Sequence, residues 1–301
     1  MIVLLFLVAS FETGKLPYSV TVGAVQNSYR LMTFTAMPGE AVPMKITPAD
    51  LAVTVVDEQG QALPTKNGTW TWPGRQQPGR YTLRVQPAQG DASVLHIFVL
   101  APLQVDDKGM MHGYHLGHYP NTPLKGLSVY KKPKGLVKVN AEDTSLQLSP
   151  HFTLGQFLCK QKSEYPIYLI VRTELLLKLE YLLELVNKKG IETDGFAFIS
   201  GFRTPYYNTL IGNVKYSRHQ WGGAADIFID RAPRDGQMDD LNRDGVVDVK
   251  DAAYLYELIN KESHSDSFKK MIGGLGQYKK TATHGPFIHV DARGFRARWG
   301  H

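Results

Sequence analysis

The sequence predicts a two-domain protein of the α+β class, and three observations predict it. Between residues 20 and 102, short runs of β-forming residues alternate with turn signals, as in a small all-β domain. Further along, leucines recur at helical spacing from Leu175 to Val186, and Lys188, Lys189 and Gly190 supply a basic last turn and a glycine stop. Finally, a chain of 301 residues, 43% of them hydrophobic, is long enough for two domains with independent cores.

The predicted strands of the first domain are short. β-Branched and aromatic residues cluster at 52–56, 81–85 and 94–100, and residues 66–69 (KNGT) carry the Asn-Gly pair of a tight hairpin turn. This pattern predicts an immunoglobulin-like sandwich over residues 20–102. A connecting segment, residues 103–140, then leads to a second domain at 141–301.

The first ten residues (MIVLLFLVAS) form an apolar run that is too short to span a bilayer comfortably. The run resembles the core of a signal peptide, but the basic residues that normally precede such a core are missing, so a buried strand is the alternative. We expect residues 1–19 to be a signal-like or truncated export segment, and no membrane span elsewhere. The net charge of +6 suits an anionic partner, whereas the scattered lysines and arginines argue against nucleic acid.

Two segments of the second domain supply a set of metal ligands. Residues 217–229 (SRHQWGGAADIFI) place His219 seven residues before Asp226, and the glycines between them indicate a loop entering a strand at 225–229. In residues 287–291 (FIHVD), alternation puts His289 on one strand face and the aliphatic residues on the other. Two imidazoles and one carboxylate leave a catalytic Zn²⁺ one open position, whereas structural zinc sites close all four, usually with thiolates. The chain has one cysteine, so the sequence favours an open zinc site.

These segments, together with residues 199–205 (ISGFRTP) and 273–278 (GGLGQY), resemble the zinc D-Ala-D-Ala peptidase family. The family belongs to the LAS group, which includes the hedgehog signalling domain, and the closest resemblance is to the bacterial murein endopeptidases. It covers roughly residues 141–301. It implies a hedgehog- and D,D-peptidase-like antiparallel sheet with helices, and a zinc held by His219, Asp226 and His289. It further implies a periplasmic or cell-envelope enzyme that hydrolyses peptidoglycan stem peptides or their cross-links, with carboxypeptidase and endopeptidase activity both open.

The resemblance also suggests catalytic residues. Arg203 matches the family arginine that contacts the substrate carboxylate or the developing oxyanion, a role that suits a fixed guanidinium beside a metal. Many relatives have an acidic general base three residues before the last ligand, where this chain has Pro286. His284 and Asp291 are therefore the two candidate bases, and each is alternatively an orienting residue. The missing acid also leaves a catalytically inactive zinc-containing binding protein as an alternative function.

A second metal pattern lies at residues 240–251 (DLNRDGVVDVKD), a twelve-residue EF-hand-type loop with glycine at position 6. Aspartate at position 12 resembles dockerin loops, and a helix is expected over 252–260. Only one copy is present, without a clear helix before it, so we expect a structural Ca²⁺ and keep a calcium-dependent docking protein as the alternative. The predicted calcium ligands are Asp240, Asn242, Asp244, the Val246 carbonyl, Asp248 and Asp251.

Three histidines, His112, His115 and His118, lie in residues 110–120 among glycine, tyrosine and proline. No carboxylate or cysteine accompanies them. We therefore expect an ordered aromatic loop lying on the second domain rather than a metal site.

Overall fold

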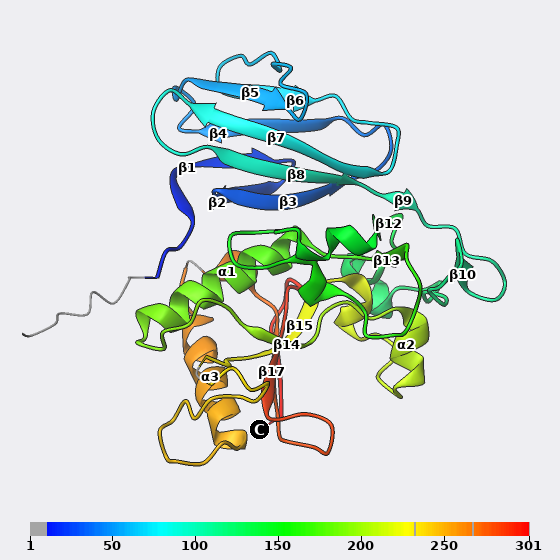
Figure 1. Cartoon of the computed structure of the whole chain (residues 1–301), viewed down its shortest axis with the longest axis vertical. Coiled ribbons are helices and arrows are strands. Elements are labelled where there is room, and N and C mark those ends of the chain that lie inside the picture. Colours follow the sequence, from blue (N-terminus) through cyan, green and yellow to red (C-terminus); the bar gives the residue numbers. More distant parts are fainter. Residues whose placement is uncertain (1–10, 232, 267, 301) are drawn as a thin grey trace, which may run out of the picture.

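The structure, a computed structural model, describes residues 11–231, 233–266 and 268–300. It is a mixed α and β fold in which a β-sandwich lies above a second body of strands and helices (Figure 1). The apolar run predicted at the start of the chain, residues 1–10, lies outside the described residues. Within the described part of the chain, no helix has the length and apolar character needed to cross a membrane.

Two four-stranded sheets form the N-terminal sandwich, with strand orders β2-β1-β4-β6 and β3-β8-β7-β5. The three predicted runs correspond to β5, β7 and β8. The predicted hairpin turn is confirmed, because Asn67 and Gly68 both have positive φ. The first strand begins at Lys15 rather than at the expected residue 20. The strands are β1 (Lys15–Val22), β2 (Val25–Tyr29), β3 (Leu31–Ala36), β4 (Val42–Thr47), β5 (Val53–Asp57), β6 (Thr69–Trp72), β7 (Gly79–Pro87) and β8 (Ser93–Val99).

The connecting segment is ordered by its contacts with the second domain. The His115 ring stacks on Tyr206 with 3.6 Å between ring centroids, and the Tyr119 hydroxyl donates to the Gln220 carbonyl at 2.8 Å. The expectation of an ordered aromatic loop is thus confirmed. Its elements, and those that follow it, are β9 (Ala101–Pro102), β10 (Met110–Met111), β11 (Tyr114–His115), β12 (Gly135–Val139), β13 (Ile167–Leu169) and the 3₁₀ helices η1 (Leu124–Gly126), η2 (Ser128–Tyr130), η3 (Ala141–Ser145) and η4 (Leu154–Phe157).

A five-stranded sheet of order β14-β15-β17-β16-β18 forms the centre of the second domain. Its strand pairs are antiparallel except for β16 and β18, which run parallel. The predicted leucine helix is α1, which ends just before Gly190 at φ 82°. The strands are β14 (Ala197–Ser200), β15 (Ala224–Phe228), β16 (Gly274–Tyr278), β17 (Phe287–Asp291) and β18 (Ala297–Trp299), and the helices are α1 (Thr173–Lys188), α2 (Pro205–Leu210), α3 (Val249–Glu262), η5 (Arg218–Trp221) and η6 (Lys269–Met271).

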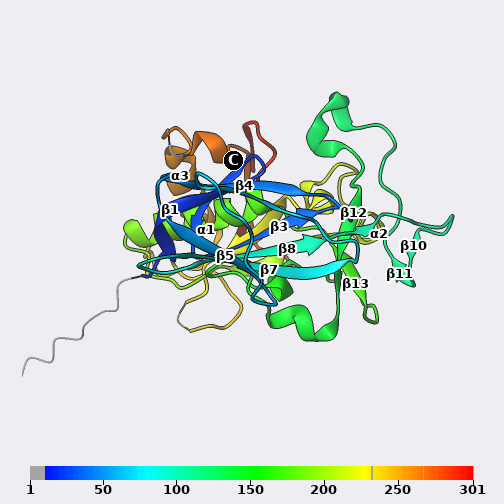
Figure 2. The same cartoon turned by 90° about the horizontal axis from the view of Figure 1, so that it is seen from above.

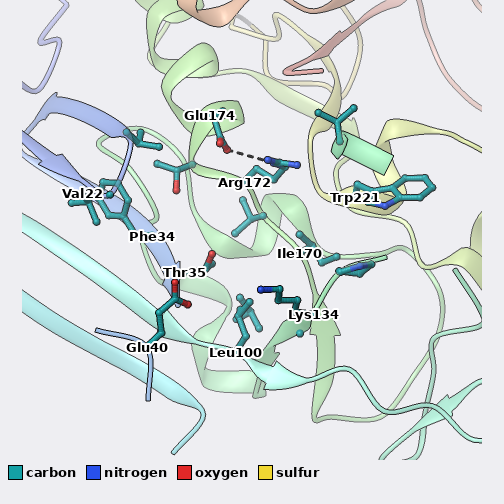
Figure 3. A pocket seen from close by; sticks show the side chains of 18 of the residues that line it. Val22, Phe34, Thr35, Glu40, Leu100, Lys134, Ile170, Arg172, Glu174 and Trp221 are labelled. Atoms are coloured by element: carbon teal, nitrogen blue, oxygen red, sulfur yellow. Dashed lines mark hydrogen bonds and ion pairs between the residues drawn. The ribbon is translucent and has the colours of Figure 1, made fainter. Parts of the chain in front are cut away.

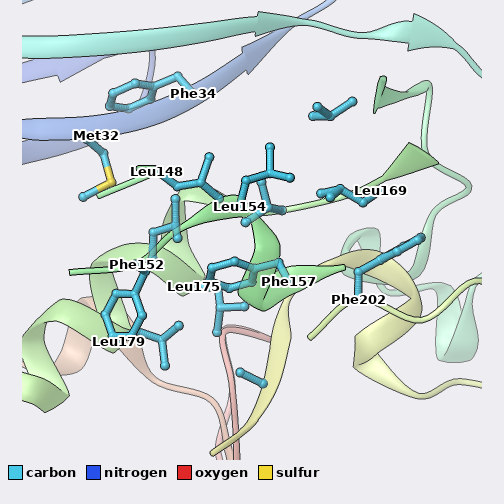
Figure 4. Close-up of a cluster of buried hydrophobic side chains, with 14 of the residues drawn as sticks. Met32, Phe34, Leu148, Phe152, Leu154, Phe157, Leu169, Leu175, Leu179 and Phe202 are labelled. Atoms are coloured by element: carbon cyan, nitrogen blue, oxygen red, sulfur yellow. The ribbon is translucent and has the colours of Figure 1, made fainter. Parts of the chain in front are cut away.

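The two domains share one hydrophobic core, so the expectation of independent cores was wrong. Met32 and Phe34 of β3 join the cluster around Leu148, Leu175 and Phe157 of the second domain (Figure 4). The sandwich strands lie across α1 when the molecule is seen from above (Figure 2). Because β3 packs against α1 as well as inside the sandwich, four of its six residues are buried, and the two cores are continuous.

Candidate metal centre

Strand register brings two of the predicted ligands together. Asp226 of β15 lies directly opposite His289 of β17, and His289 in turn lies opposite Gly276 of β16. Directly opposed residues point to the same face of an antiparallel sheet, so the carboxylate and the imidazole are neighbours. His219 comes from η5, whose end at Gly222 has φ 60°. A Cβ at Gly222 would lie 2.2 Å from the Ile170 carbonyl oxygen, so only glycine permits this close turn.

The three side chains converge on one point. Asp226 Oδ1 lies 2.8 Å from His289 Nδ1 and 3.1 Å from His219 Nε2, and the two nitrogens are 3.2 Å apart. A tetrahedral zinc with bonds of about 2.0–2.1 Å holds its ligand atoms roughly 3.3 Å from one another. The spacing therefore fits the edges of such a site.

The other ring nitrogen of each histidine has an acceptor that fixes the tautomer. His219 Nδ1 lies 2.6 Å from the Gly201 carbonyl oxygen, and His289 Nε2 lies 3.2 Å from the Asp291 carboxylate, so each of these nitrogens donates its proton. In the neutral rings, His219 Nε2 and His289 Nδ1 then carry lone pairs. Two lone pairs and a carboxylate oxygen that face one another repel, and a cation between them removes that repulsion. The donor set thus fits zinc.

Burial and charge act together on the protonation of these groups. Burial holds the pKa of His219 below its ordinary value. Burial also opposes ionisation of Asp226, but His219 and His289 outweigh it, so its pKa lies well below the usual range. For His289, hydrogen bonds with two carboxylates outweigh burial and raise the pKa. A metal competes with that proton for Nδ1, so acid should weaken metal binding.

No protein-family model matches the chain, and no curated protein shows a significant match. Only the geometry of these residues therefore supports a metal site here. Among the described residues, His219, Asp226 and His289 are the only group of three or more His, Cys, Asp or Glu side chains whose ligand atoms all lie within 4.8 Å of one another.

Arg203 lies beside the centre and contacts one of its ligands. Its Nη2 is 2.5 Å from Asp226 Oδ2, and its Nε donates to the Ser200 hydroxyl at 2.8 Å. The guanidinium thus orients the carboxylate so that Oδ1 faces the two imidazoles. Arg203 also lines the cleft in front of the ligands. Its position is compatible with the predicted contact to developing negative charge, and it has this additional role of holding Asp226.

Asp291 lies behind His289 and is fully buried. Its carboxylate accepts hydrogen bonds from Arg293, from the Gly274 amide and from His289 Nε2. Although burial opposes ionisation, the bonds from His289 and Arg293 hold the pKa of Asp291 far below its usual range. A carboxylate with so many donors is a poor proton acceptor, so the geometry favours the orienting role over the general base.

Lys178, on α1, also holds Asp291 in position. Its buried ammonium donates to the Asp291 backbone carbonyl at 2.7 Å and lies 5.1 Å from the centre of the Phe268 ring. Sequence reasoning missed both Lys178 and Arg293. One signal was present, since Lys178 stands three residues after Leu175 and therefore on the apolar face of the helix.

His284 lies in the loop between β16 and β17, is half-buried and lines the same cleft as the three ligands. Its Nδ1 donates to the Gly285 carbonyl at 2.8 Å, and its ring edge contacts Phe287. This tautomer leaves Nε2 as the atom able to accept a proton. Of the two predicted bases, only His284 has an acceptor atom that receives no hydrogen bond from the described residues.

The cleft is open, about 1080 Å³ in volume, and basic. Among the described residues that line it, Asp226 is the only acidic one. Lys160, Lys215 and Arg218 also line it, and none of the three forms an ion pair with any described residue. Two guanidinium nitrogens of Arg218 are buried without a hydrogen-bond partner, while its charge lies 4.9 Å from the centre of the Tyr130 ring. The surroundings of the centre therefore favour an anionic ligand.

A second cavity, of about 380 Å³, lies between the sandwich and the second domain (Figure 3). It is bordered by Phe34 and Leu100 on one side and by Arg172, paired with Glu174, on the other. None of the predicted metal ligands lines it. The predicted zinc ligands therefore line the larger cleft and not this cavity.

The predicted calcium loop is arranged differently from the zinc ligands. Asp240 accepts hydrogen bonds from the Asp244 and Gly245 amides, and Gly245 has φ 86°. Lys250 Nζ lies 3.1 Å from Asp244 Oδ2 and lowers the pKa of that carboxyl. The loop therefore has the internal bonds of a tight acidic turn, and its carboxylates do not converge on one point as the three predicted zinc ligands do.

The last residues of this loop form the first turn of α3. Asp251 is buried, and its two oxygens accept from the Leu241, Asn242 and Asp248 amides. Asp248 caps the helix, and Asp251 completes the capping box. The helix expected at 252–260 is confirmed, with the loop supplying its first turn.

Proposed function

We propose that the chain is a zinc-dependent peptidase that hydrolyses peptidoglycan stem peptides or their cross-links. The observation that carries the proposal is the convergence of one nitrogen from each of two imidazoles and one carboxylate oxygen at the edge of a basic cleft. Three protein ligands leave the fourth position of a tetrahedral zinc open, as catalytic sites require. The metal, when bound, supplies a Lewis acid that polarises a carbonyl and acidifies water.

The chain's own residues provide the remaining functions. His284 Nε2 takes a proton from the attacking water and passes it to the leaving amine as the C–N bond breaks. Arg203 holds Asp226 and stabilises negative charge on the substrate. Asp291, fixed by Arg293 and Lys178, keeps the His289 ring oriented and, in the neutral ring, holds the proton on Nε2 so that Nδ1 faces the metal position.

The charge of the cleft supports the substrate class. Lys160, Lys215 and Arg218 add three positive charges that form no ion pair with a described residue, so a peptide bearing carboxylates is favoured over a neutral or basic one. Stem peptides of murein carry such carboxylates, in agreement with the family resemblance of residues 141–301. An immunoglobulin-like sandwich, a D,D-peptidase-like second domain and an exported, cell-envelope location belong to the same proposal.

The calcium loop is part of the proposal as a structural element. A Ca²⁺ held by residues 240–251 would order the segment between β15 and α3. Since Asp226 precedes this segment and His289 follows it, an ordered loop helps to hold the two halves of the zinc site.

Digestion of purified cross-linked murein tests the function. We expect the zinc-loaded protein to release products whose masses, measured by mass spectrometry, show either loss of terminal D-Ala or opening of cross-links. The His219→Ala variant and a chelated sample are the controls and should release neither. A zinc-loaded wild-type protein that leaves murein intact would instead support a binding protein without catalysis.

A further inference from the structure

Trp299, near the end of the chain, packs against the metal centre. It lies on β18, opposite Gly276 of β16, which is itself opposite His289. The centroids of the Trp299 and His289 rings are 5.1 Å apart. The indole therefore forms one wall beside a predicted zinc ligand.

The glycines of residues 273–278 make room for this indole. A Cβ at Gly276 would lie 2.2 Å from Trp299 Nε1, and a Cβ at Gly274 would lie 2.9 Å from the same ring and 2.2 Å from Asp291 Oδ2. Two glycines spaced by two residues leave one face of a strand bare, and a bulky side chain can lie across it. The glycines at 274 and 276 therefore leave the space in which the Trp299 ring packs beside the predicted metal ligands.

The indole nitrogen donates a hydrogen bond of 2.8 Å to the hydroxyl oxygen of Tyr278. Tyr278 stands two residues after Gly276 on the same strand, so its side chain points to the face that carries His289, about 7 Å along the sheet. Its ring stacks on Phe287 at 4.6 Å, with 7° between the ring planes. Trp299 and Phe287 thus fix the position of the phenol. Tyr278 lines the same cleft as the predicted metal ligands.

This arrangement leaves one hydrogen-bonding group of the phenol unused. Trp299 occupies a lone pair of the Tyr278 oxygen, and the hydroxyl proton donates to no atom of the described residues. The side chain is 39% exposed, so the proton is accessible from the cleft. A fixed donor at this place is the kind of group that stabilises charge in a transition state, because it costs no reorganisation during the reaction.

We propose that the Tyr278 hydroxyl donates a hydrogen bond to the carbonyl oxygen of the scissile bond as negative charge develops on it, and that Trp299 is the positioning residue that aims this hydroxyl. The inference rests on the proposed peptidase function. It assigns Tyr278 as a catalytic residue facing the substrate alongside Arg203.

Kinetics of the Tyr278→Phe variant on a cross-linked muropeptide dimer test the proposal. The phenylalanine keeps the stack on Phe287, so we expect normal zinc content, a nearly unchanged KM and a kcat lower by on the order of 10². Trp299→Phe should lower kcat less, and the double variant should be no slower than Tyr278→Phe alone, since both changes remove one interaction. Tyr254→Phe, an exposed tyrosine on α3, is the matched control and should behave as wild type.

Binding gives a second readout that does not depend on turnover. A phosphinate analogue of the scissile dipeptide mimics the tetrahedral transition state, and calorimetry should show its affinity for zinc-loaded Tyr278→Phe reduced by a similar factor. Wild-type kcat and wild-type phosphinate affinity in this variant would overturn the proposal. Loss of zinc from Trp299→Phe, or additive effects in the double variant, would overturn the positioning role. An inactive wild type would refute the proposed function instead, and phosphinate binding would then decide the Tyr278 contact by itself.

Discussion

The two regions that the sequence predicts to bind metals differ in how far the chain assembles each site by itself. At the candidate zinc centre, the three potential ligand atoms are buried and within 4.8 Å of one another, held by Gly201, Arg203 and Asp291. In residues 240–251, Asp244 is exposed, Asp240 and Asp248 are half-buried and Asp251 is buried, and these carboxylates are bonded to amides of their own loop or to Lys250. Sheet register fixes two of the three predicted zinc ligands, whereas a calcium loop closes fully only around its ion.

This difference predicts different consequences of metal loss. Removing zinc should abolish chemistry and leave the fold in place, because hydrogen bonds and strand pairing already hold the ligands. Removing calcium should lower stability and leave the zinc chemistry intact while the protein is folded. The following predictions test the contrast, beginning with the largest expected effect.

Changing a zinc ligand should have the greatest effect on activity. We expect His219→Ala or His289→Ala to contain no stoichiometric zinc by metal analysis and to show no detectable murein hydrolysis, with a circular dichroism spectrum close to that of wild type. His118→Ala, an exposed histidine of the connecting segment, should keep both zinc and activity. A ligand variant that is fully active without zinc would refute the metal centre.

Two variants should separate proton transfer from ligand orientation. His284→Ala should lower kcat by on the order of 10² while zinc remains bound. Asp291→Asn should weaken zinc binding by about 10- to 100-fold, because it weakens the acceptor of the His289 proton. Competition with a zinc chelator and steady-state kinetics measure both effects. If Asp291→Asn instead keeps its zinc affinity and loses kcat, Asp291 is the base.

Lys178 provides a pH test of the buried support. Burial lowers its pKa to about 8, whereas a lysine in the unfolded chain titrates near 10.5. Between these values the folded protein has released a proton that the unfolded chain retains, so the free energy of unfolding should rise with pH, by at most about 3 kcal/mol. Guanidinium unfolding curves between pH 8 and 10 should show a smaller rise for Lys178→Met. Equal pH dependence in the two proteins would mean that Lys178 does not titrate in this window.

Calcium should have a smaller effect, on stability alone. An ion that binds only the folded state adds about 2.7 kcal/mol at a hundred times its dissociation constant, so chelating calcium with zinc replenished should lower Tm. Asp244→Ala should reproduce that loss, and Asp107→Ala, an exposed aspartate of the connecting segment, should not. If Tm is unchanged by chelation and by Asp244→Ala, residues 240–251 are only a solvated acidic turn.

Much of the local structure could be predicted because its signals are local. Clusters of β-forming residues predicted β5, β7 and β8, and the helical spacing of leucines predicted α1. The Asn67-Gly68 pair predicted a turn that needs positive φ. The spacing of His219 and Asp226 likewise indicated a loop running into a strand, as η5 and β15 show.

What the sequence could not predict depends on contacts between distant residues. The pairing of Asp226 with His289 requires the strand register, and Lys178 reaches Asp291 across 113 positions. The shared core was missed because β3 is buried by α1 as well as by its own sandwich. The packing of Trp299 beside His289 could not be predicted either, because it joins distant strands. Glycines at 274 and 276 are the sequence signal for a bulky side chain over β16.

Anomalous diffraction at the zinc absorption edge tests the central claim most directly. The account predicts one strong peak per chain, about 2.0–2.2 Å from His219 Nε2, Asp226 Oδ1 and His289 Nδ1, with no fourth protein ligand. It also predicts that the two imidazoles keep their hydrogen bonds to Gly201 and Asp291. Zinc-loaded crystals with no peak at this point, or with a fourth side chain closing the site, would contradict the account.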